Sequence, residues 1–589
     1  MQGIILTQEQ QNVINFDGSL VAIAKPGSGK TTVLSRLIKR KLPDFLSHQG
    51  VIAISYTNKA SDELKKRSTK GGIDIKSSFF GTIDKFCDSE IIIPFLPHLW
   101  GRPEEEITVS KISDLSEVDR EAFAGITEKS VSLDQLVKHL GALRSWFKKG
   151  KLFLETNSAL AHYTIKRSRA CRRYLKTRYR YIIVDEYQDS DIEQHELFLK
   201  LHSLGLIAVA VGDPDQSIFG FSNKDPKYLL SLPKKSEFKT FHITINHRSH
   251  PSIINYSLKF LDKGAELIET DEIRVFHKHC AGNTANISAW IDKSIQQLVK
   301  KYNVDQFSKI GILVRHGRTA SEINSSLLSK HRLFDTHPLE NHLSLWAKIF
   351  SALLYYRYNY DNTVQNIIES FGPRITASEI RKVKTQIRKV RGIADDELYG
   401  QLLEIANTLL PKATSKEAVR LLIESDPAMF PAFFKAAEDD EIQIMTLHKV
   451  KGLEFDIVFH LDLHEWVLPA KRPGPGNDWN NPEYPTLEQD ANLHYVGITR
   501  ARKACFLCTT KRSSKSHDVI LTKTVQDFAD IFFKSFDISR LEFHQFILHL
   551  VPKFFNAIEF WTVRRQEIEC QPLLSQHLQH RLNRFRFVE

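Results

Sequence analysis

The sequence has little cysteine, little methionine and no long apolar run. Its 589 residues include 6 cysteines and 3 methionines, and so few cysteines exclude a disulfide framework and indicate a reducing environment. The longest apolar stretch lies near 204–211, far short of the roughly 18 residues that a membrane span requires. The initial residues MQGIILTQEQ lack a basic start followed by an apolar segment, so we expect no secretory signal. These absences together predict a cytoplasmic protein that does not enter a membrane.

The remaining composition is that of a folded protein with a basic excess. Hydrophobic residues make up 42% and charged residues 26% of the chain, which excludes the disordered and collagen-like classes. A chain of this length predicts about four structural units. Lysine and arginine total 81 against 70 acids, giving a net charge of +11. That excess suits a polyanionic partner but does not identify one by itself.

Short apolar runs alternate with helical patterns through the first 265 residues. Such continuous runs are typical of parallel strands that helices cover on both faces. The predicted strands are Ser19–Ala24, Val51–Ser55, Tyr181–Glu186, Leu206–Asp213 and Phe241–Asn246. A second pattern of the same kind begins near residue 270, with strands expected at Lys309–Arg315, Glu441–His448, Phe455–Leu463 and Ala504–Thr510. The fold class is therefore α/β, with helix-like, charged insertions at 88–165 and 356–440.

A phosphate-binding loop follows the first predicted strand. The residues Ala24–Thr31 read AKPGSGKT and open a helix that runs towards Arg40, which is the strand, loop and helix order that a P-loop requires. Gly27 and Gly29 allow backbone N–H groups to turn towards phosphate oxygens, and the start of the helix adds its positive dipole end. Lys30 would reach the β- and γ-phosphates. The alternative interpretation is an ordinary glycine turn before a helix, since Ala24 replaces the usual first glycine.

Two adjacent acids end another predicted strand. Asp185 and Glu186 follow a buried apolar run, and a carboxylate at the C-terminal edge of a parallel sheet can hold Mg²⁺. The second acid can orient and deprotonate an attacking water. Acids after a strand are common by themselves, but beside a P-loop they complete an ATP hydrolysis site.

Further segments occur in a fixed order along about 500 residues. They are Leu6–Gln10, the P-loop, Tyr56–Ala60, Gly81–Asp84, Asp185–Asp189, Gly212–Phe221, Asn246–Ser249, Thr446–Phe455 and Tyr495–Ala501. In order and spacing they resemble the motifs of superfamily 1A DNA helicases of the UvrD/Rep/PcrA type. The resemblance implies two RecA-like parallel-sheet cores with ATP bound in the cleft between them.

The resemblance also implies the cofactors and the site residues. ATP and Mg²⁺ are the expected cofactors, with Thr31 and Asp185 as the metal ligands. The residues expected to run hydrolysis are Lys30, Thr31, Asp185, Glu186, Gln216, Arg248 and Arg500. The expected nucleotide contacts are Gln10, Ala24, Lys25, Pro26, Gly27, Ser28, Gly29, Lys30, Thr31, Thr32, His247 and Glu454. The expected DNA contacts are Tyr56, Thr57, Asn58, Thr82, Phe219, Phe221, Thr446 and His448.

Some positions depart from the usual pattern of the family. His247 stands where a tyrosine usually stacks on adenine, and Thr32 stands where many relatives have arginine. Asp84 replaces a histidine near the DNA path, and the segment Trp466–Pro469 replaces one that usually offers a phenylalanine to a base. The departures affect the DNA contacts more than the ATP site.

The domain organisation expected from the resemblance has five parts. They are a first core at 1–87 and 166–265, an insertion at 88–165, a second core at 266–355 and 441–525, a reduced insertion at 356–440, and a helical C-terminal extension at 526–589. The second insertion is markedly shorter than in the housekeeping relatives. Compact helicase subunits of bacterial antiphage systems, of the Gabija type, share that reduction.

Two functions follow from this interpretation. The first is an ATP-dependent helicase or translocase that moves 3′ to 5′ on single-stranded DNA, with single-stranded or partly duplex DNA as its partner. The second is a DNA-stimulated ATPase that regulates a nuclease complex or senses DNA for it, with little unwinding alone. The motifs do not separate the two, because both need the same ATPase. A kinase or GTPase that uses only the P-loop is excluded by the motifs at 446–455 and 495–501.

Two further sequence features each allow two interpretations. Cys505 and Cys508 form a Cys-x-x-Cys in a predicted strand, where a spacing of three places them on opposite faces; packing is the preferred interpretation over metal or redox chemistry. Six basic residues cluster on one predicted helix of the second insertion, and they form either a solvated face or a phosphate contact: Arg381, Lys382, Lys384, Arg388, Lys389 and Arg391.

Overall fold

The computed structural model describes residues 5–105, 107–126, 131–220, 223–262, 264–359, 362–371, 376–411, 415–464 and 467–510. Residues 5–269 and 274–510 of this chain belong to one compact unit. Phe221, Trp466 and the expected C-terminal extension at 526–589 lie outside the described residues. No helix within the described ranges is both long and apolar enough to cross a bilayer.

The first sheet is six-stranded and parallel throughout. Its order is β3 (Phe79–Gly81), β2 (Gly50–Ile54), β6 (Tyr179–Val184), β7 (Ile207–Gly212), β1 (Leu20–Ala24) and β8 (Lys239–Ile243). All of β2 and nearly all of β1, β6 and β7 are buried, as expected for strands that helices cover on both faces. The helices of this core are α1 (Gln8–Asn15), α2 (Lys30–Lys41), α3 (Asn58–Thr69), α4 (Ile83–Phe86), α12 (Ile192–Ser203) and α13 (Lys227–Ser231). The next helix, α14 (Pro251–Leu261), packs against the second sheet, where Ile253 and Phe260 join its core.

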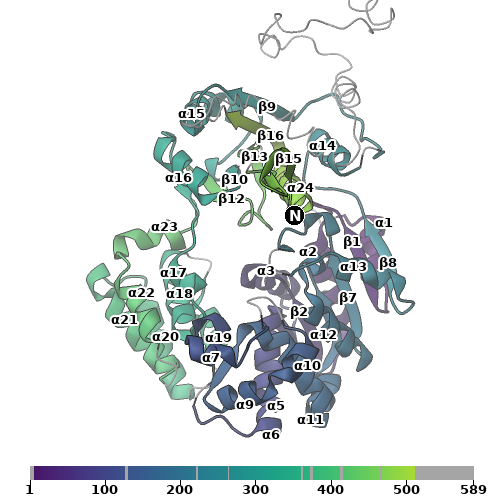
Figure 1. Cartoon of the computed structure of the whole chain (residues 1–589), viewed down its shortest axis with the longest axis vertical. Coiled ribbons are helices and arrows are strands. Elements are labelled where there is room, and N and C mark those ends of the chain that lie inside the picture. Colours follow the sequence, from purple (N-terminus) through teal and green to yellow (C-terminus); the bar gives the residue numbers. More distant parts are fainter. Residues whose placement is uncertain are drawn as a thin grey trace, which may run out of the picture. The chain divides into compact units, whose positions relative to one another are not determined.

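The second sheet is also six-stranded and parallel. Its order is β11 (His331–Leu333), β12 (Ile442–Thr446), β10 (Ile310–Val314), β13 (Phe455–His460), β16 (Ala501–Thr510) and β9 (Val275–Cys280). Its helices include α15 (Thr284–Lys301), α16 (Gly317–Ser326) and α24 (Leu487–Ile498), and Figure 1 shows α15 and α16 beside this sheet. Cys505 and Cys508 are both fully buried and belong to two different core clusters, which agrees with packing on opposite faces. The expected α/β class with two parallel-sheet cores is confirmed.

The segment between α4 and β6 is mostly helical. It contains α5 (Ile93–Phe95), α6 (Pro97–Trp100), α7 (Glu117–Glu121), α8 (Leu133–Lys138), α9 (Leu140–Lys148), α10 (Asn157–Arg167) and α11 (Arg169–Arg178). It also holds a small parallel pair that the sequence pattern does not predict, β4 (Thr108–Ser110) with β5 (Lys151–Phe153).

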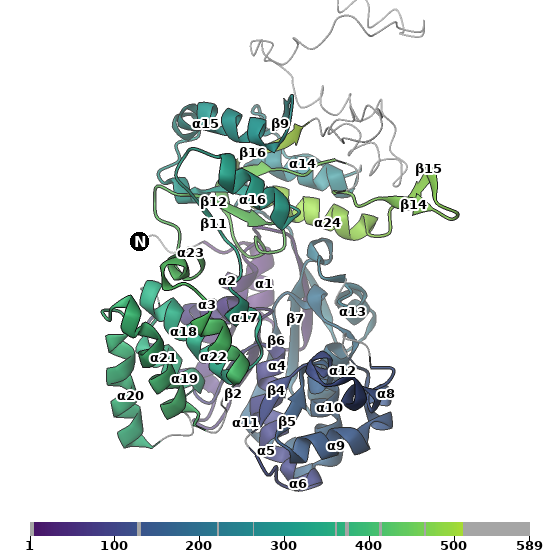
Figure 2. The same ribbon diagram turned by 60° about the vertical axis from the view of Figure 1, so that its left-hand side comes forward.

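The segment between β11 and β12 contains helices joined by short loops, and no strand among its described residues. It holds α17 (Pro338–Asn341), α18 (Leu345–Tyr358), α19 (Val364–Phe371), α20 (Ala377–Lys389), α21 (Asp395–Leu409), α22 (Lys416–Ile423) and α23 (Phe430–Phe434). These helices enclose a core cluster of their own, and they stand together in Figure 2. The expected domain boundaries themselves stay a prediction.

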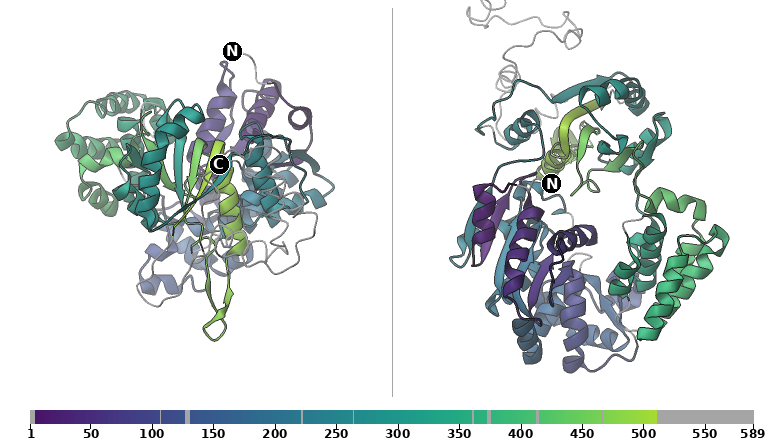
Figure 3. Two further views of the ribbon diagram at one scale, coloured as in Figure 1. Left: turned by 90° about the horizontal axis from the view of Figure 1, so that it is seen from above. Right: turned by 180° about the vertical axis from the view of Figure 1, so that it is seen from behind.

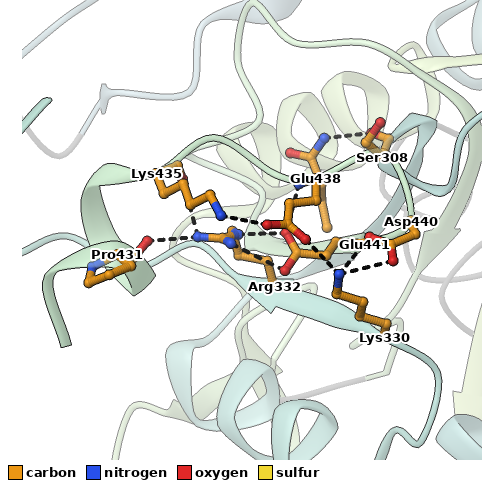
Figure 4. Close-up of polar contacts among 9 residues, drawn as sticks. Ser308, Lys330, Arg332, Pro431, Lys435, Glu438, Asp440 and Glu441 are labelled. Carbon is orange, nitrogen blue, oxygen red and sulfur yellow. Dashed lines mark hydrogen bonds and ion pairs between the residues drawn. The ribbon is translucent and has the colours of Figure 1, made fainter. Parts of the chain in front are cut away.

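A network of ion pairs joins β11 to the residues just before β12, where the chain leaves the helical segment and returns to the second sheet (Figure 4). Arg332 of β11 pairs through Nε with Glu441 Oε2 at 2.9 Å and donates from Nη1 to the carbonyl of Pro431 at 2.7 Å. Lys330 adds an ion pair with Glu438 at 2.6 Å. The Arg332 and Glu441 side chains are about nine-tenths buried, so this pair is shielded from salt more than the exposed ones around it.

A hairpin stands where the sequence predicts only a turn-rich loop. β14 (Arg472–Gly474) pairs antiparallel with β15 (Asp478–Glu483) just before α24, and Figure 3 shows it projecting away from the second sheet. Trp479 on this hairpin is 45% exposed.

Candidate functional site

The phosphate loop has the backbone that the sequence predicts for it. Gly27 and Gly29 adopt φ values of +70° and +80°, which a residue with a Cβ rarely adopts. A Cβ at Gly27 would lie 2.3 Å from Oδ1 of Asn246, so the loop is closed against the segment that carries His247 and Arg248. The backbone N–H of His247 donates to the carbonyl of Gly27 at 2.9 Å. The loop and the Asn246–Ser249 motif therefore form one wall.

The loop leads directly into α2, whose first residue is Lys30. Ala24 ends β1, and Lys25 and Pro26 begin the loop; Thr31 and Thr32 lie in the first turn of the helix. The hydroxyl Oγ of Ser28 is buried and has no hydrogen-bond partner among the described residues. An orphaned hydroxyl, two left-handed glycines and a helix start fit a bound phosphate group.

The acid pair lies next to the loop lysine. Lys30 Nζ is 3.7 Å from Glu186 Oε1, and Gln188 Nε2 donates to Glu186 Oε2 at 2.6 Å. Glu186 has φ +54°, an uncommon left-handed conformation for a glutamate. Asp185 and Glu186 thus follow β6 with their carboxylates close to the lysine that is expected to bind phosphate.

The surroundings of Asp185 and Glu186 shift the pKa values of the two carboxyls in opposite directions. Burial and the adjacent Glu186 carboxylate raise the pKa of Asp185. Burial opposes ionisation of Glu186 as well, but Lys30 and Lys451 outweigh it and lower the pKa of Glu186. Glu186 therefore stays an anion able to accept a proton. The Asp185 carboxylate and the Thr31 hydroxyl are oxygen donors of the kind that Mg²⁺ prefers alongside substrate phosphates, so these residues fit the expected metal.

Arg500 from the second sheet reaches the first core. It follows α24 and is 2% exposed, and its Nη2 donates to Gln216 Oε1 at 2.9 Å. Gln216 in turn donates from Nε2 to Asp213 Oδ2 at 2.7 Å. No carboxylate of the described chain lies within 4.0 Å of the guanidinium, and burial, with repulsion from Arg248, lowers the pKa of Arg500 to about 9. A buried cation without an anionic partner is the arrangement that a transferring phosphoryl group would complete.

Arg248 belongs to the first core and also faces the second. Its Nε lies 2.7 Å from Glu454 Oε2, and its Nη1 donates to the carbonyl of Thr499 at 3.4 Å. Glu454, expected at the ribose, also pairs with Arg502 at 3.1 Å. The structure therefore brings Arg248, Glu454 and Arg500 to the same junction.

Gln10, the residue expected to read adenine, lies on α1. Gln10 is 3% exposed; its Nε2 donates to the carbonyl of Ser28 at 2.9 Å, and its Oε1 accepts from the backbone of Thr7 at 3.0 Å. His247 is exposed. The structure thus ties the expected adenine-reading glutamine to the phosphate loop, and it leaves the His247 ring at the surface.

Sequence reasoning assigned no role to Lys451, which the structure places at the centre of the site. Its ammonium contacts the Asp189 carboxylate, donates to the carbonyl of Gln216 at 2.9 Å and lies 5.1 Å from the ring centre of Phe219. Asp189 and Gln216 belong to the first core, and Lys451 belongs to the second. A single lysine therefore touches the nucleotide motifs and an expected DNA-contacting ring.

Three of the expected DNA contacts form a cluster. The rings of Tyr56 and Phe219 are stacked at 4.7 Å with an interplanar angle of 23°, and His448 lies 6.1 Å from Phe219. Tyr56 is 38% exposed. Burial, with Arg315 nearby, lowers the pKa of His448 to about 4, so this ring is neutral at neutral pH and suits a base rather than a phosphate.

The other expected DNA contacts lie at the ends of helices and strands. Thr57 caps α3 and Thr82 caps α4, each accepting a backbone N–H through its hydroxyl oxygen. Asn58 is the first residue of α3, and Thr446 ends β12. Phe221 lies outside the described residues. In the second insertion, Arg391 is held by the carbonyls of Tyr356 and Asn362, while the other basic residues of that cluster lie on α20.

Comparison with protein families matches two parts of this chain. A model described as the UvrD/REP helicase N-terminal domain matches residues 6–95 and 148–237. A model described as the UvrD-like helicase C-terminal domain matches residues 360–512. The two matches together cover the P-loop, the acid pair, Lys451 and Arg500.

Several curated proteins are similar along most of the chain. The Gabija protein GajB of Bacillus cereus is 27% identical over 507 residues, covering 84% of this chain and 93% of that protein. A probable DNA helicase II homolog of Rickettsia conorii is 23% identical over 633 residues, covering 87% and 93%. The ATP-dependent DNA helicase PcrA of Staphylococcus aureus is 22% identical over 618 residues, covering 85% and 82%. The three alignments cover nearly the same share of this chain, but those with the two helicases are more than 100 positions longer than the one with GajB. The two helicases therefore contain segments that this chain lacks.

Proposed function

Because this chain belongs to the family of UvrD-like helicases, we propose that it is an ATP-dependent DNA helicase that moves 3′ to 5′ along single-stranded DNA in the cytoplasm. The observation that carries the proposal is the junction of the two sheets. Arg500 bonds to Gln216, and Lys451 contacts Asp189 and the Gln216 carbonyl. A γ-phosphate bound between these groups would contact residues of both cores, so its loss on hydrolysis would change the contacts between the cores.

The hydrolysis itself is assigned to residues around the phosphate loop. Bound Mg²⁺ would neutralise charge on the β- and γ-phosphates, held by Thr31 and Asp185. Lys30 binds the phosphates, Glu186 accepts the proton of the attacking water, and Arg248 and Arg500 stabilise charge on the γ-phosphoryl group. Arginines in this role are worth roughly 10³–10⁵ in rate in other phosphoryl-transfer enzymes.

Coupling to DNA is assigned to the stacked pair and the lysine beside it. The Phe219 ring lies 5.1 Å from Lys451 Nζ, and Phe219 follows Gln216 by three residues. A change at the γ-phosphate that shifts Gln216 or Lys451 therefore reaches a ring on which a base can stack. Cleft closure that alternates grip on a strand makes a translocating motor.

The proposal is tested with duplexes that carry a single-stranded tail. We expect the protein and ATP to separate a duplex with a 3′ tail, and not one with a 5′ tail or none. Equal unwinding of both tails would contradict the direction. ATP hydrolysis that rises with single-stranded DNA while neither duplex is separated would instead support the second candidate.

The second candidate is a DNA-stimulated ATPase that acts as the regulatory or DNA-sensing subunit of a nuclease complex in antiviral defence. It is favoured by the similarity to a Gabija protein, which covers 84% of this chain and 93% of that protein. The test is purification from the native host, with and without residues 526–589. We expect a nuclease to accompany the full chain, and full-length protein that purifies alone would contradict this candidate.

A further inference from the structure

One segment of the first core is rich in cations and has no acid. Between Thr156 and Val184 the chain carries eight lysines and arginines and neither aspartate nor glutamate. Soluble surfaces normally intersperse charges of both signs. The middle of this segment is α11 (Arg169–Arg178).

Two of these cations bind other parts of the first core. Arg178 pairs with Glu90 at 2.9 Å, and Arg172 donates to the carbonyls of Ile165 and Lys166 at 2.7 Å each. These bonds fix α11 at both ends. They also account for the arginines of the segment that are only half-exposed.

Of the other six cations, Arg167 lies over the Tyr163 ring at 5.9 Å from its centre, and the remaining five have exposed side chains on or beside α11. Arg169, Arg173 and Lys176 follow at intervals of four and three residues, which places them one turn apart on the same face of α11. Lys166 precedes them and Arg180 follows them, and all five side chains are exposed. In the part of the chain that the structure describes, none of these five has an ion-pair or hydrogen-bond partner for its charged group. We call these five residues the α11 surface.

The α11 surface lies away from the ATP site. α11 ends at Arg178 and β6 begins at Tyr179, whereas Asp185 follows the other end of β6. Six residues of strand span about 20 Å, so the surface leads to the opposite edge of the sheet from the acid pair. Figures 1 and 2 show α11 near α5 and α6, at the end of the core remote from α2.

The chemistry of this surface favours a nucleic-acid backbone over a protein. A protein interface needs an apolar centre, yet no large apolar side chain is exposed in residues 138–191, all of which the structure describes. Arginine is the side chain that suits phosphate recognition. Unpaired cations one helical turn apart can neutralise neighbouring phosphates without reading bases.

We propose that the α11 surface is a second nucleic-acid site, which binds the phosphate backbone of duplex DNA outside the cleft between the cores. The site does not depend on the ATPase chemistry proposed above. It would hold one stretch of DNA while the cleft acts on another.

The test uses a blunt 20-bp DNA duplex as the probe and the full chain as the protein. The variant Arg169→Gln/Arg173→Gln/Lys176→Gln removes three charges from the surface. We expect its affinity for the duplex at low salt to fall about tenfold or more. The slope of log affinity against log salt should shrink by about 2 to 3, because each neutralised phosphate contributes about 0.9. The matched control is Lys234→Gln/Lys293→Gln/Lys300→Gln, which removes three exposed cations elsewhere and should change both quantities much less.

Further readouts keep the outcomes distinct. ATP hydrolysis stimulated by a short single strand should be retained in the α11 variant, so a failure of the motor proposal would be seen separately. The variant Arg169→Lys/Arg173→Lys should restore most of the duplex binding, which shows that charge and not folding was lost. Equal losses in the α11 variant and the control would overturn the proposal. So would unchanged duplex binding combined with lost binding of poly-glutamate, since that would make the surface a site for an acidic protein.

Discussion

The Arg500 guanidinium donates a 2.9 Å hydrogen bond from Nη2 to Oε1 of Gln216, across 284 residues of sequence. One partner follows α24 beside the second sheet, and the other follows β7 of the first. Both side chains are buried, and the amide of Gln216 is oriented by Asp213. This contact makes the two cores sensitive to the same small displacement at the expected γ-phosphate position.

Replacing Arg500 tests its role in the transition state. Arg500→Ala should lower kcat for ATP by about 10³-fold, because a guanidinium at the γ-phosphoryl group contributes mainly to the transition state. Binding of a single-stranded oligonucleotide should change little, since several motifs share that grip. Steady-state kinetics and fluorescence anisotropy measure the two effects. A variant with a raised KM and an unchanged kcat would contradict this role.

The loop lysine and the second acid should fail in different ways. Lys30→Ala removes a phosphate-binding cation and should lose both ATP binding and turnover. Glu186→Gln keeps the size of the side chain but loses the base, so it should bind ATP and not hydrolyse it. Binding of a fluorescent ATP analogue separates the two variants. Near wild-type hydrolysis by either one would contradict the site assignment.

The stacked rings should matter for DNA and not for basal hydrolysis. Tyr56→Ala and Phe219→Ala should each weaken binding of a single strand by about 1–3 kcal/mol, the usual cost of losing one base stack. Leu230→Ala, which shortens another exposed apolar side chain, is the control. Unchanged oligonucleotide affinity in both aromatic variants would mean that the rings only pack against each other.

Lys451 should be needed for coupling as well as for folding. Lys451→Met leaves the Asp189 carboxylate buried without its cation, which should lower the free energy of unfolding by about 3 kcal/mol. The double variant Lys451→Met/Asp189→Asn should recover much of that stability. DNA should nevertheless stimulate ATP hydrolysis by this double variant only weakly, because the lysine that links Gln216 to Phe219 is absent. Full stimulation in the double variant would contradict a coupling role.

A buried histidine pair predicts loss of stability in acid. His494 Nδ1 on α24 lies 3.2 Å from Nε2 of His460, the last residue of β13. Burial lowers the pKa of His460 to about 4 and that of His494 well below its usual value. The unfolded chain therefore binds more protons than the folded one between about pH 6.5 and 4, so stability falls as pH falls through that window. Each histidine costs about 1.4 kcal/mol per pH unit there. In urea titrations, His460→Gln should reduce the protons linked to unfolding by about one, and an unchanged pH slope would contradict this.

The sequence predicts the interior of each sheet better than its edges. Strands such as β1, β6 and β10 are continuous apolar runs, so their burial is visible in the residues themselves. The edge strand β9 (VFHKHC) is interrupted by polar residues and is half-exposed, and β11 has only three residues. Both were missed because an edge strand need not be apolar on both faces.

Some parts of the candidate site are also easier to predict from the sequence than others. The P-loop and the acid pair are predicted from local motifs, because strand, loop and helix order sets their geometry. The contacts of Lys451 with Asp189 and of Arg500 with Gln216 join residues more than 250 positions apart, so no local pattern contains them. The hairpin that carries Trp479 was expected as a loop, because its glycines and prolines conceal two short strands.

The most direct test of the account is the rate of ATP hydrolysis with and without a single-stranded oligonucleotide, measured for the wild-type chain and for Gln216→Ala. We expect the oligonucleotide to stimulate the wild-type rate at least tenfold and to stimulate the Gln216→Ala variant only weakly, while that variant still binds the strand. A wild-type rate that does not respond to single-stranded DNA, or a Gln216→Ala variant that responds in full, would contradict the claim that this junction couples nucleotide to DNA.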